Sequence, residues 1–272
     1  MPTPMEEFLF DLRGFTVIPQ VIETDHLNEI NDWIDELPPL EQVEWLGNME
    51  VQTYGDIDGL NLQHIIEGGE LFERMIDHPA WIDLVRYYLG SLTDPFINEC
   101  FINLRGRGGY IGVHSGGWKT DGRVRSGVQG GKWCVQYLSL LVALNDIGPG
   151  DGATVVIPGS HKSFFQHPQQ TEGVGITHRP GEEIEGTEEI HLRAGDALML
   201  NDMLIHGSAA RTNEGLRRTV VFRYLPRIYA HRWGYEPSPE LLQRLTPERH
   251  KMVQPTVPHR PPCNHSDEAH HD

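Results

Sequence analysis

Three segments of the 272-residue chain combine residue types that could do chemistry. They are YIGVHSGG at 110–117, NDIGPGDGATVVIPGSHK at 145–162, and GDALMLNDMLIHGS at 195–208, which is followed by RRTVVFRY at 217–224. Imidazoles are common transition-metal ligands, so His114 and His206 could bind a metal. Considered singly, each is equally compatible with a hydrogen-bonded histidine at the end of a strand.

The glycines of the second segment do not form a phosphate-binding loop. Gly150, Gly152 and Gly159 are followed neither by a GK[ST] sequence nor by the start of a helix, and a phosphate loop needs both. We interpret these glycines as parts of β-turns.

The ordered combination of DGATVVIPGSHK, GDALML, HGS and an arginine eleven residues after the histidine of HGS is specific. It resembles the phytanoyl-CoA dioxygenase family of Fe(II)- and 2-oxoglutarate-dependent oxygenases. The resemblance covers most of the chain, from GFTVIPQVI at 14–22 to about Pro226. It implies a mainly β fold, the double-stranded β-helix or cupin-like jelly roll, with N-terminal helices packed on one sheet. The implied cofactors are Fe(II) and 2-oxoglutarate, with O2 as co-reactant.

The resemblance also implies a metal site. His114 matches the first histidine ligand of the family, and His206, 92 residues later, matches the second. Such remote positions meet in a jelly roll because strands distant in sequence face each other. His161, in PGSHK, matches a turn whose histidine usually supports the structure.

The cosubstrate site follows from the same comparison. Arg217 matches the position that grips the distal carboxylate of 2-oxoglutarate through paired hydrogen bonds. Arg218 should point to the opposite side of the strand. Ser208 matches a position whose hydroxyl reaches that carboxylate. The further cofactor-binding candidates are Ser115, Asn103 and Tyr137.

The sequence departs from the family at Gly116, where the motif is HSG in place of HxD or HxE. Three explanations compete. In the first, only His114 and His206 hold the iron and water or an anion fills the open position, which is chloride in the related HxG halogenases. In the second, another carboxylate reaches the metal, with Asp121, Glu99 and Asp202 as the candidates. In the third, the site has degenerated and the fold binds a ligand without turnover.

Two kinds of local pattern position these segments. Residues 1–92 are predicted to be mostly helical, including a helix in 23–37 capped by Thr24 or Asp25 and a helical region at 70–90 that ends at Gly90. Between 96 and 226, seven short β-branched and aromatic runs alternate with turns, which is typical of a jelly roll. We predict a single domain at 1–246 and a poorly ordered tail at 247–272.

Composition limits the partners. Lys and Arg total 22 against 39 Asp and Glu, a formal net charge of −17, which disfavours nucleic acid and anionic membranes. Residues 105–133 form a basic, glycine-rich island that suggests a mobile lid and an anionic substrate. The acidic N-terminus and three widely spaced cysteines favour a cytoplasmic protein in a reducing compartment. The oligomeric state is not predicted.

We therefore predict a non-haem Fe(II)- and 2-oxoglutarate-dependent dioxygenase that hydroxylates an unactivated C–H bond of a small molecule. The alternatives are an HxG-type halogenase that uses the same cofactors with chloride, and a non-catalytic jelly-roll binding protein.

Overall fold

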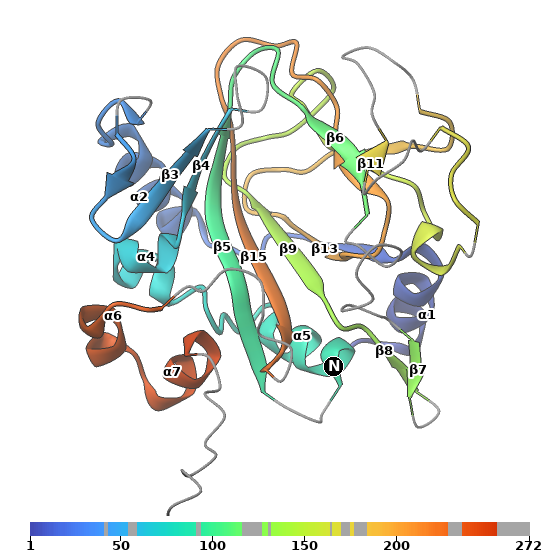
Figure 1. The fold of residues 1–272 in the computed structure, drawn as a ribbon, viewed down its shortest axis with the longest axis horizontal. Coiled ribbons are helices and arrows are strands. Elements are labelled where there is room, and N and C mark those ends of the chain that lie inside the picture. The colour runs from blue at the N-terminus through green and yellow to red at the C-terminus, as the bar shows by residue number, and fades with distance from the viewer. Residues whose placement is uncertain are drawn as a thin grey trace, which may run out of the picture.

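A large antiparallel sheet runs through the molecule, and a smaller antiparallel sheet lies against part of one face (Figure 1). The computed structural model describes residues 1–40, 43–53, 59–90, 94–115, 127–129, 132–163, 165–169, 175–176, 184–227 and 236–254. Two facing sheets built from strands remote in sequence confirm the predicted jelly-roll class.

The large sheet has the strand order β1-β13-β9-β15-β5-β4-β3-β2. In that order, its strands are Phe15–Ile18, Ala197–Asn201, Leu138–Ala143, Arg217–Pro226, Pro95–Arg105, Leu60–Gln63, Met49–Thr53 and Trp45–Leu46. The N-terminal third was predicted to be mostly helical, yet it also supplies four of these strands, β1 to β4. Leu60–Gln63 is buried along its whole length, and its pairing with β5 outweighs its weak local pattern.

The smaller sheet has the order β11-β6-β14-β10-β12. Its strands are Gly175–Ile176, Ile111–His114, His206–Ser208, Thr154–Val156 and Glu188–Ile190. A separate two-stranded ribbon joins β7, Gly127–Gln129, to β8, Lys132–Cys134. The second and third chemical segments of the sequence thus contribute the neighbouring strands β10 and β14.

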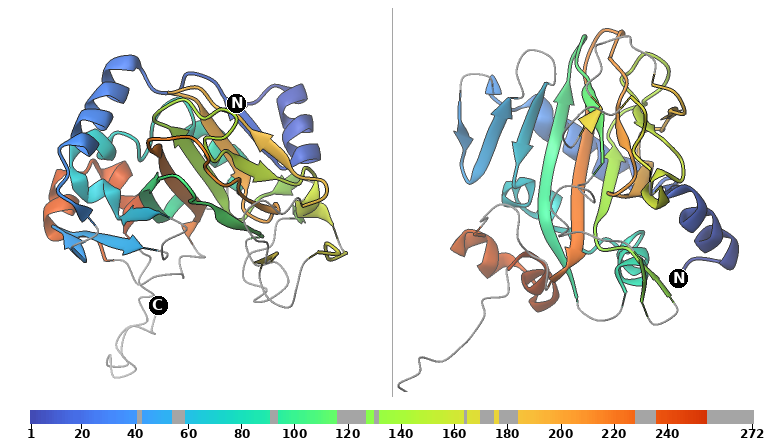
Figure 2. Two further views of the ribbon diagram at one scale, coloured as in Figure 1. Left: turned by 90° about the horizontal axis from the view of Figure 1, so that it is seen from above. Right: turned by 45° about the vertical axis from the view of Figure 1, so that its right-hand side comes forward.

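The pleat of the large sheet divides its side chains between two environments. In β9, Leu138, Leu140 and Val142 join the main hydrophobic core, which the helices also line. In β13, Leu198 and Leu200 join a second core, which includes Val156 and Ile190 of the smaller sheet. Successive strand residues point to opposite faces, so one face is covered by helices and the other by the smaller sheet (Figure 2).

The helices α1 (Pro4–Arg13), α2 (Thr24–Asp35), α4 (Glu70–Glu73), α5 (Ile82–Leu89), α6 (Pro239–Arg244) and α7 (Pro247–Val253) all contribute side chains to the main core. The short turns η2 (Ile65–Gly68) and η3 (Ser160–Lys162) complete the described elements. In the part of the chain described, no helix is both long and apolar enough to cross a membrane.

Two helix predictions need correction. The N-cap of α2 is Glu23, not Thr24 or Asp25, and its side chain makes no capping hydrogen bond. The segment expected to be a poorly ordered tail begins with a helix, α7, because Met252 and Val253 are buried against the core. Gly90 does cap α5 as predicted.

The helix-covered core should dominate stability. Phe222 of β15 is fully buried in it, so Phe222→Ala should lower the free energy of unfolding by about 3–5 kcal/mol. Phe8 of α1 is 58% exposed, so Phe8→Ala should change it by less than about 0.5 kcal/mol. Urea unfolding of the two variants measures both values, and equal losses would contradict this assignment of the core.

Candidate active site

His114 and His206 form a cross-strand pair on the smaller sheet. His114 ends β6, His206 begins β14, and their Cα atoms are register partners. Their ring centroids lie 4.4 Å apart at an interplanar angle of 52°. The predicted meeting of these two residues is therefore what the structure shows.

Each imidazole is oriented by the carbonyl oxygen two residues before it. Nδ1 of His114 lies 2.8 Å from the oxygen of Gly112, and Nδ1 of His206 lies 2.7 Å from that of Leu204. A carbonyl oxygen only accepts, so both Nδ1 atoms carry the proton and both Nε2 atoms present a lone pair. This orientation is typical of histidines that bind metals.

The two strands approach closely at Gly207. A Cβ atom at this position would lie 2.8 Å from the oxygen of Ile111 and 2.9 Å from Cα of Val113. No side chain fits in that space, so the glycine of the HGS motif permits the close approach that brings the imidazoles together.

Burial favours the neutral form of both imidazoles. It is the main cause that lowers the pKa of His114, and the neighbouring His206 lowers it further. Burial also lowers the pKa of His206, although Asp202 partly opposes this. Neutral imidazoles with available Nε2 lone pairs suit divalent iron.

A small pocket opens beside the histidine pair, with a volume of about 60 Å³. The pocket is lined by residues of β5, β6, β9, β10, β14 and β15. They are Phe101, Asn103, Arg105, Ile111, His114, Ser139, Leu141, Thr154, His206, Gly207, Ser208, Arg217, Thr219, Val221 and Arg223.

Two buried arginines face each other in this pocket. Arg105 and Arg217 are Cα partners on β5 and β15 and are 0% and 3% exposed. Nη2 of Arg217 donates to Oγ1 of Thr154 at 3.2 Å, and its Nε has no hydrogen-bond partner among the described residues. Burial, followed by the charges of Arg105 and Arg211, lowers the pKa of Arg217. This end of the pocket therefore favours an anion.

Ser208 is prepared to donate a hydrogen bond. Its Oγ accepts from Nη1 of Arg105 at 2.6 Å and from the backbone N–H of Ile111 at 2.8 Å. With two donors directed at the oxygen, the hydroxyl proton is available for an acceptor in the pocket. This geometry agrees with the carboxylate-binding position that the sequence assigns to Ser208.

Asp202 lies beside the histidine pair. Its Oδ1 is 4.0 Å from Nε2 of His206 and accepts a hydrogen bond from Oγ of Ser139 at 2.8 Å. Burial acts to raise the pKa of Asp202, but Arg223, His206 and the Ser139 hydroxyl together bring it below its usual value. The side chain is therefore a buried carboxylate.

The other sequence-predicted residues lie in several places. Asn103 lines the pocket, and its Nδ2 donates to Oδ1 of Asn61 at 2.6 Å. Tyr137 is buried, accepts from Nδ2 of Asn98 at 3.1 Å and lies outside the pocket lining. Ser115 directly follows β6 and is partly buried. Gly116 and Asp121 lie outside the described residues.

Arg218 and His161 lie away from the pocket. Arg218 points to the opposite face of β15, where it pairs with Asp35 and hydrogen-bonds Asn31 of α2. Nε2 of His161 lies 3.1 Å from the backbone oxygen of Asp11 in α1. Both placements match the sequence predictions.

The expected basic island is only partly a surface feature. Arg105 belongs to β5 and is buried in the pocket, whereas Arg107 is exposed and pairs with Glu214 at 2.5 Å. Arg105 was not predicted as a site residue because glycines follow it in the sequence. The alternation of Phe101, Asn103 and Arg105 on one face of the strand was the available signal.

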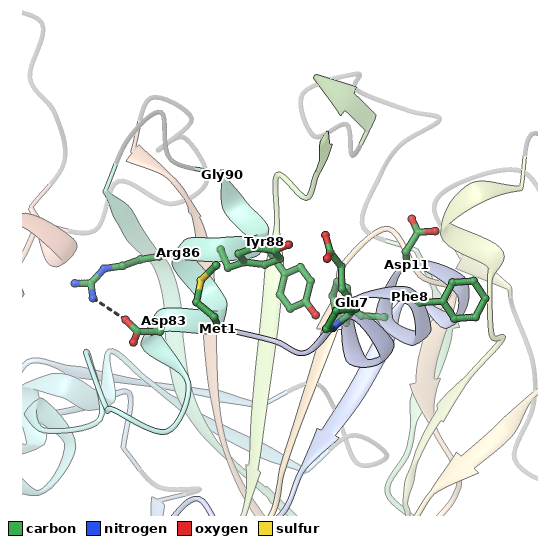
Figure 3. A pocket seen from close by; sticks show the side chains of 11 residues that line it. Met1, Glu7, Phe8, Asp11, Asp83, Arg86, Tyr88 and Gly90 are labelled. Atoms are coloured by element: carbon green, nitrogen blue, oxygen red, sulfur yellow. Dashed lines mark hydrogen bonds and ion pairs between the residues drawn. The ribbon is translucent and has the colours of Figure 1, made fainter. Parts of the chain in front are cut away.

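A larger groove of about 730 Å³ lies elsewhere, between α1 and α5. Figure 3 shows its acidic and aromatic lining, including Glu7, Phe8, Asp83 and Tyr88. It contains none of the sequence-predicted site residues.

The model of the family "Phytanoyl-CoA dioxygenase (PhyH)" matches residues 10–219. The chain belongs to this family. The predicted family is therefore confirmed.

A probable phytanoyl-CoA dioxygenase of Caenorhabditis elegans is 31% identical over 88 residues, which is 30% of this chain and 28% of the relative. The match thus spans less than a third of that relative's length.

Two solved structures show the same fold. HygX from Streptomyces hygroscopicus, with nickel and 2-oxoglutarate bound, has a TM-score of 0.69 and 22% identity over 83% of this chain and 88% of that one. The epimerase SnoN from nogalamycin biosynthesis, which depends on alpha-ketoglutarate, has a TM-score of 0.62 and 18% identity over 86% and 90%.

The histidine assignment predicts a simple contrast in metal binding. His114→Ala and His206→Ala should each weaken Ni(II) binding by more than about 100-fold, because even residues that only support a ligand contribute 10–100-fold. His161→Ala should leave it unchanged. Isothermal titration with Ni(II) tests this, and loss of binding only in the His161 variant would show that the pair is misassigned.

Proposed function

We propose that the protein is an Fe(II)- and 2-oxoglutarate-dependent dioxygenase that hydroxylates a small molecule. One observation carries the proposal: two imidazoles with directed Nε2 lone pairs share a pocket with the buried Arg217. Family membership supports it, and so does HygX, which is similar in fold and has nickel, 2-oxoglutarate and hygromycin B bound in one structure.

The residues divide the work between them. His114 and His206 hold the iron through Nε2. Arg217, with Ser208 as a second donor, binds the distal carboxylate of 2-oxoglutarate and so fixes its orientation. The apolar side chains of Leu141, Val221 and Phe101 line the same pocket and limit the access of water. Bound iron and 2-oxoglutarate supply the oxidation, in which R–H, 2-oxoglutarate and O2 give R–OH, succinate and CO2.

We propose a small-molecule substrate, and the cytoplasmic location expected from the sequence stays a prediction. An anionic substrate was inferred from the basic island, but Arg105 faces the cosubstrate pocket. A preference for an anionic substrate would therefore depend on the other basic residues of that island.

Halogenation is a second candidate because Gly116 cannot ligate iron. In that case chloride would occupy the position that a carboxylate fills in the family. The anaerobic complex of the protein with Fe(II) and 2-oxoglutarate should show a weak visible charge-transfer band. A chloride-dependent shift of that band would favour halogenation, whereas absence of the band would favour a binding protein without turnover.

The clamp assignment predicts a difference between neighbouring arginines. Arg217→Ala should weaken the binding of 2-oxoglutarate by about 1.5–3 kcal/mol, since a charged hydrogen-bond donor is lost. Arg218→Ala should have a much smaller effect because its side chain contacts α2. Anaerobic titration of the Fe(II) protein with 2-oxoglutarate gives both affinities. Equal losses would mean that Arg217 does not bind the cosubstrate.

A further inference from the structure

We propose that Asp202 replaces the missing carboxylate of the HSG motif and is the third protein ligand of the metal. This inference rests on the proposed function and deepens it. The metal would then be held by His114 together with an Asp-x-x-x-His segment, Asp202 to His206, in place of the family's His-x-Asp pair.

The first argument is electrostatic. Nε2 of His114 and Nε2 of His206 are both lone-pair acceptors, because each Nδ1 donates to a carbonyl. The carboxylate of Asp202 adds a third acceptor, 4.0 Å from Nε2 of His206, and it is buried. A divalent cation placed among these acceptors would be attracted by all three.

The second argument is the charge balance around Asp202. The charge of Asp202 is not balanced by an ion pair with an arginine or lysine among the described residues; the ion-pair partner within 4.0 Å is His206. Arg223, which lines the same pocket, is ion-paired with Glu99 at 2.7 Å. The remaining negative charge lies beside the histidine pair, where a divalent metal would balance it.

The third argument compares the alternatives. Both carboxylate oxygens of Glu99 are engaged, by Nε2 of Gln63 at 3.1 Å and by Nη1 of Arg223. The only hydrogen bond resolved for the carboxylate of Asp202 is the one that Ser139 donates to Oδ1. Asp121, the remaining candidate, lies outside the described residues. Asp202 therefore has an oxygen 4.0 Å from an imidazole nitrogen, whereas the carboxylate of Glu99 is held by Gln63 and Arg223.

The distance is within reach of a metal site. With bonds of about 2.1 Å, neighbouring ligands lie about 3 Å apart and opposite ligands about 4.2 Å apart. Within the described ranges, no three His, Cys, Asp or Glu side chains are yet close enough to close a metal site. A shift of the Asp202 carboxylate by about 1 Å would bring it to the position of a neighbouring ligand. Asp202 lies in the turn that joins β13 to β14, four residues before His206.

The test is metal affinity, measured by titrating the full-length protein with Mn(II) and with Co(II). Asp202→Asn keeps the shape of the side chain and the Ser139 hydrogen bond but removes the charge. It should weaken Mn(II) binding by at least about 10-fold. It should also change the visible spectrum of the Co(II) protein. Asp196→Asn, at a buried carboxylate in the turn before β13, and Glu99→Gln should have much smaller effects.

A rescue experiment separates ligation from general damage. In the Asp202→Asn protein, Gly116→Asp should restore Mn(II) affinity, because it returns a carboxylate to the family position. Gly116→Asn, its uncharged equivalent, should not. Thermal unfolding by circular dichroism confirms that each variant is folded.

The outcomes distinguish this inference from the function on which it rests. If the wild type binds neither metal, the proposed function fails as well. If the wild type binds and folded Asp202→Asn binds equally well with an unchanged Co(II) spectrum, only the role of Asp202 is overturned. With Asp202 bound to iron, chloride should leave the charge-transfer band unchanged, and a chloride-dependent shift would also overturn the inference.

Discussion

The site depends on one cross-strand contact, the pairing of His114 with His206 on β6 and β14. Gly207 permits the strands to approach, and two backbone carbonyls orient the rings, so both Nε2 lone pairs are directed without any further side chain. Two imidazoles whose Nε2 lone pairs are directed into one pocket suit a divalent cation. We therefore propose that this pair is a preorganised metal site.

The pleat of the large sheet also directs the residues proposed to bind the cosubstrate into the pocket. In β15, Val220, Phe222 and Tyr224 enter the helix-covered core, while Arg217, Thr219, Val221 and Arg223 line the pocket. The strand β5 follows the same alternation, which places Arg105 opposite Arg217. A single pairing of two long strands thus supplies both stability and the cationic end of the site, and a slip of one residue would exchange the two faces.

The sequence predicted those parts of the fold and site that depend on local periodicity and motif spacing. The alternation of strand residues separates Arg217 from Arg218, and the HGS motif identifies His206. The sequence did not reveal strands β2 to β4, because their pairing with β5 is a tertiary effect. Nor could it rank Glu99, Asp121 and Asp202, since their distances from the histidines depend on a turn and on ion pairs that only the fold defines.

The most direct measurement is a crystal structure of the protein with Ni(II) and 2-oxoglutarate. The account predicts one metal ion bonded to Nε2 of His114, Nε2 of His206 and the carboxylate of Asp202, with the distal carboxylate of 2-oxoglutarate on Arg217 and Ser208. A metal ion bound elsewhere, or 2-oxoglutarate outside the pocket between β5 and β15, would contradict it.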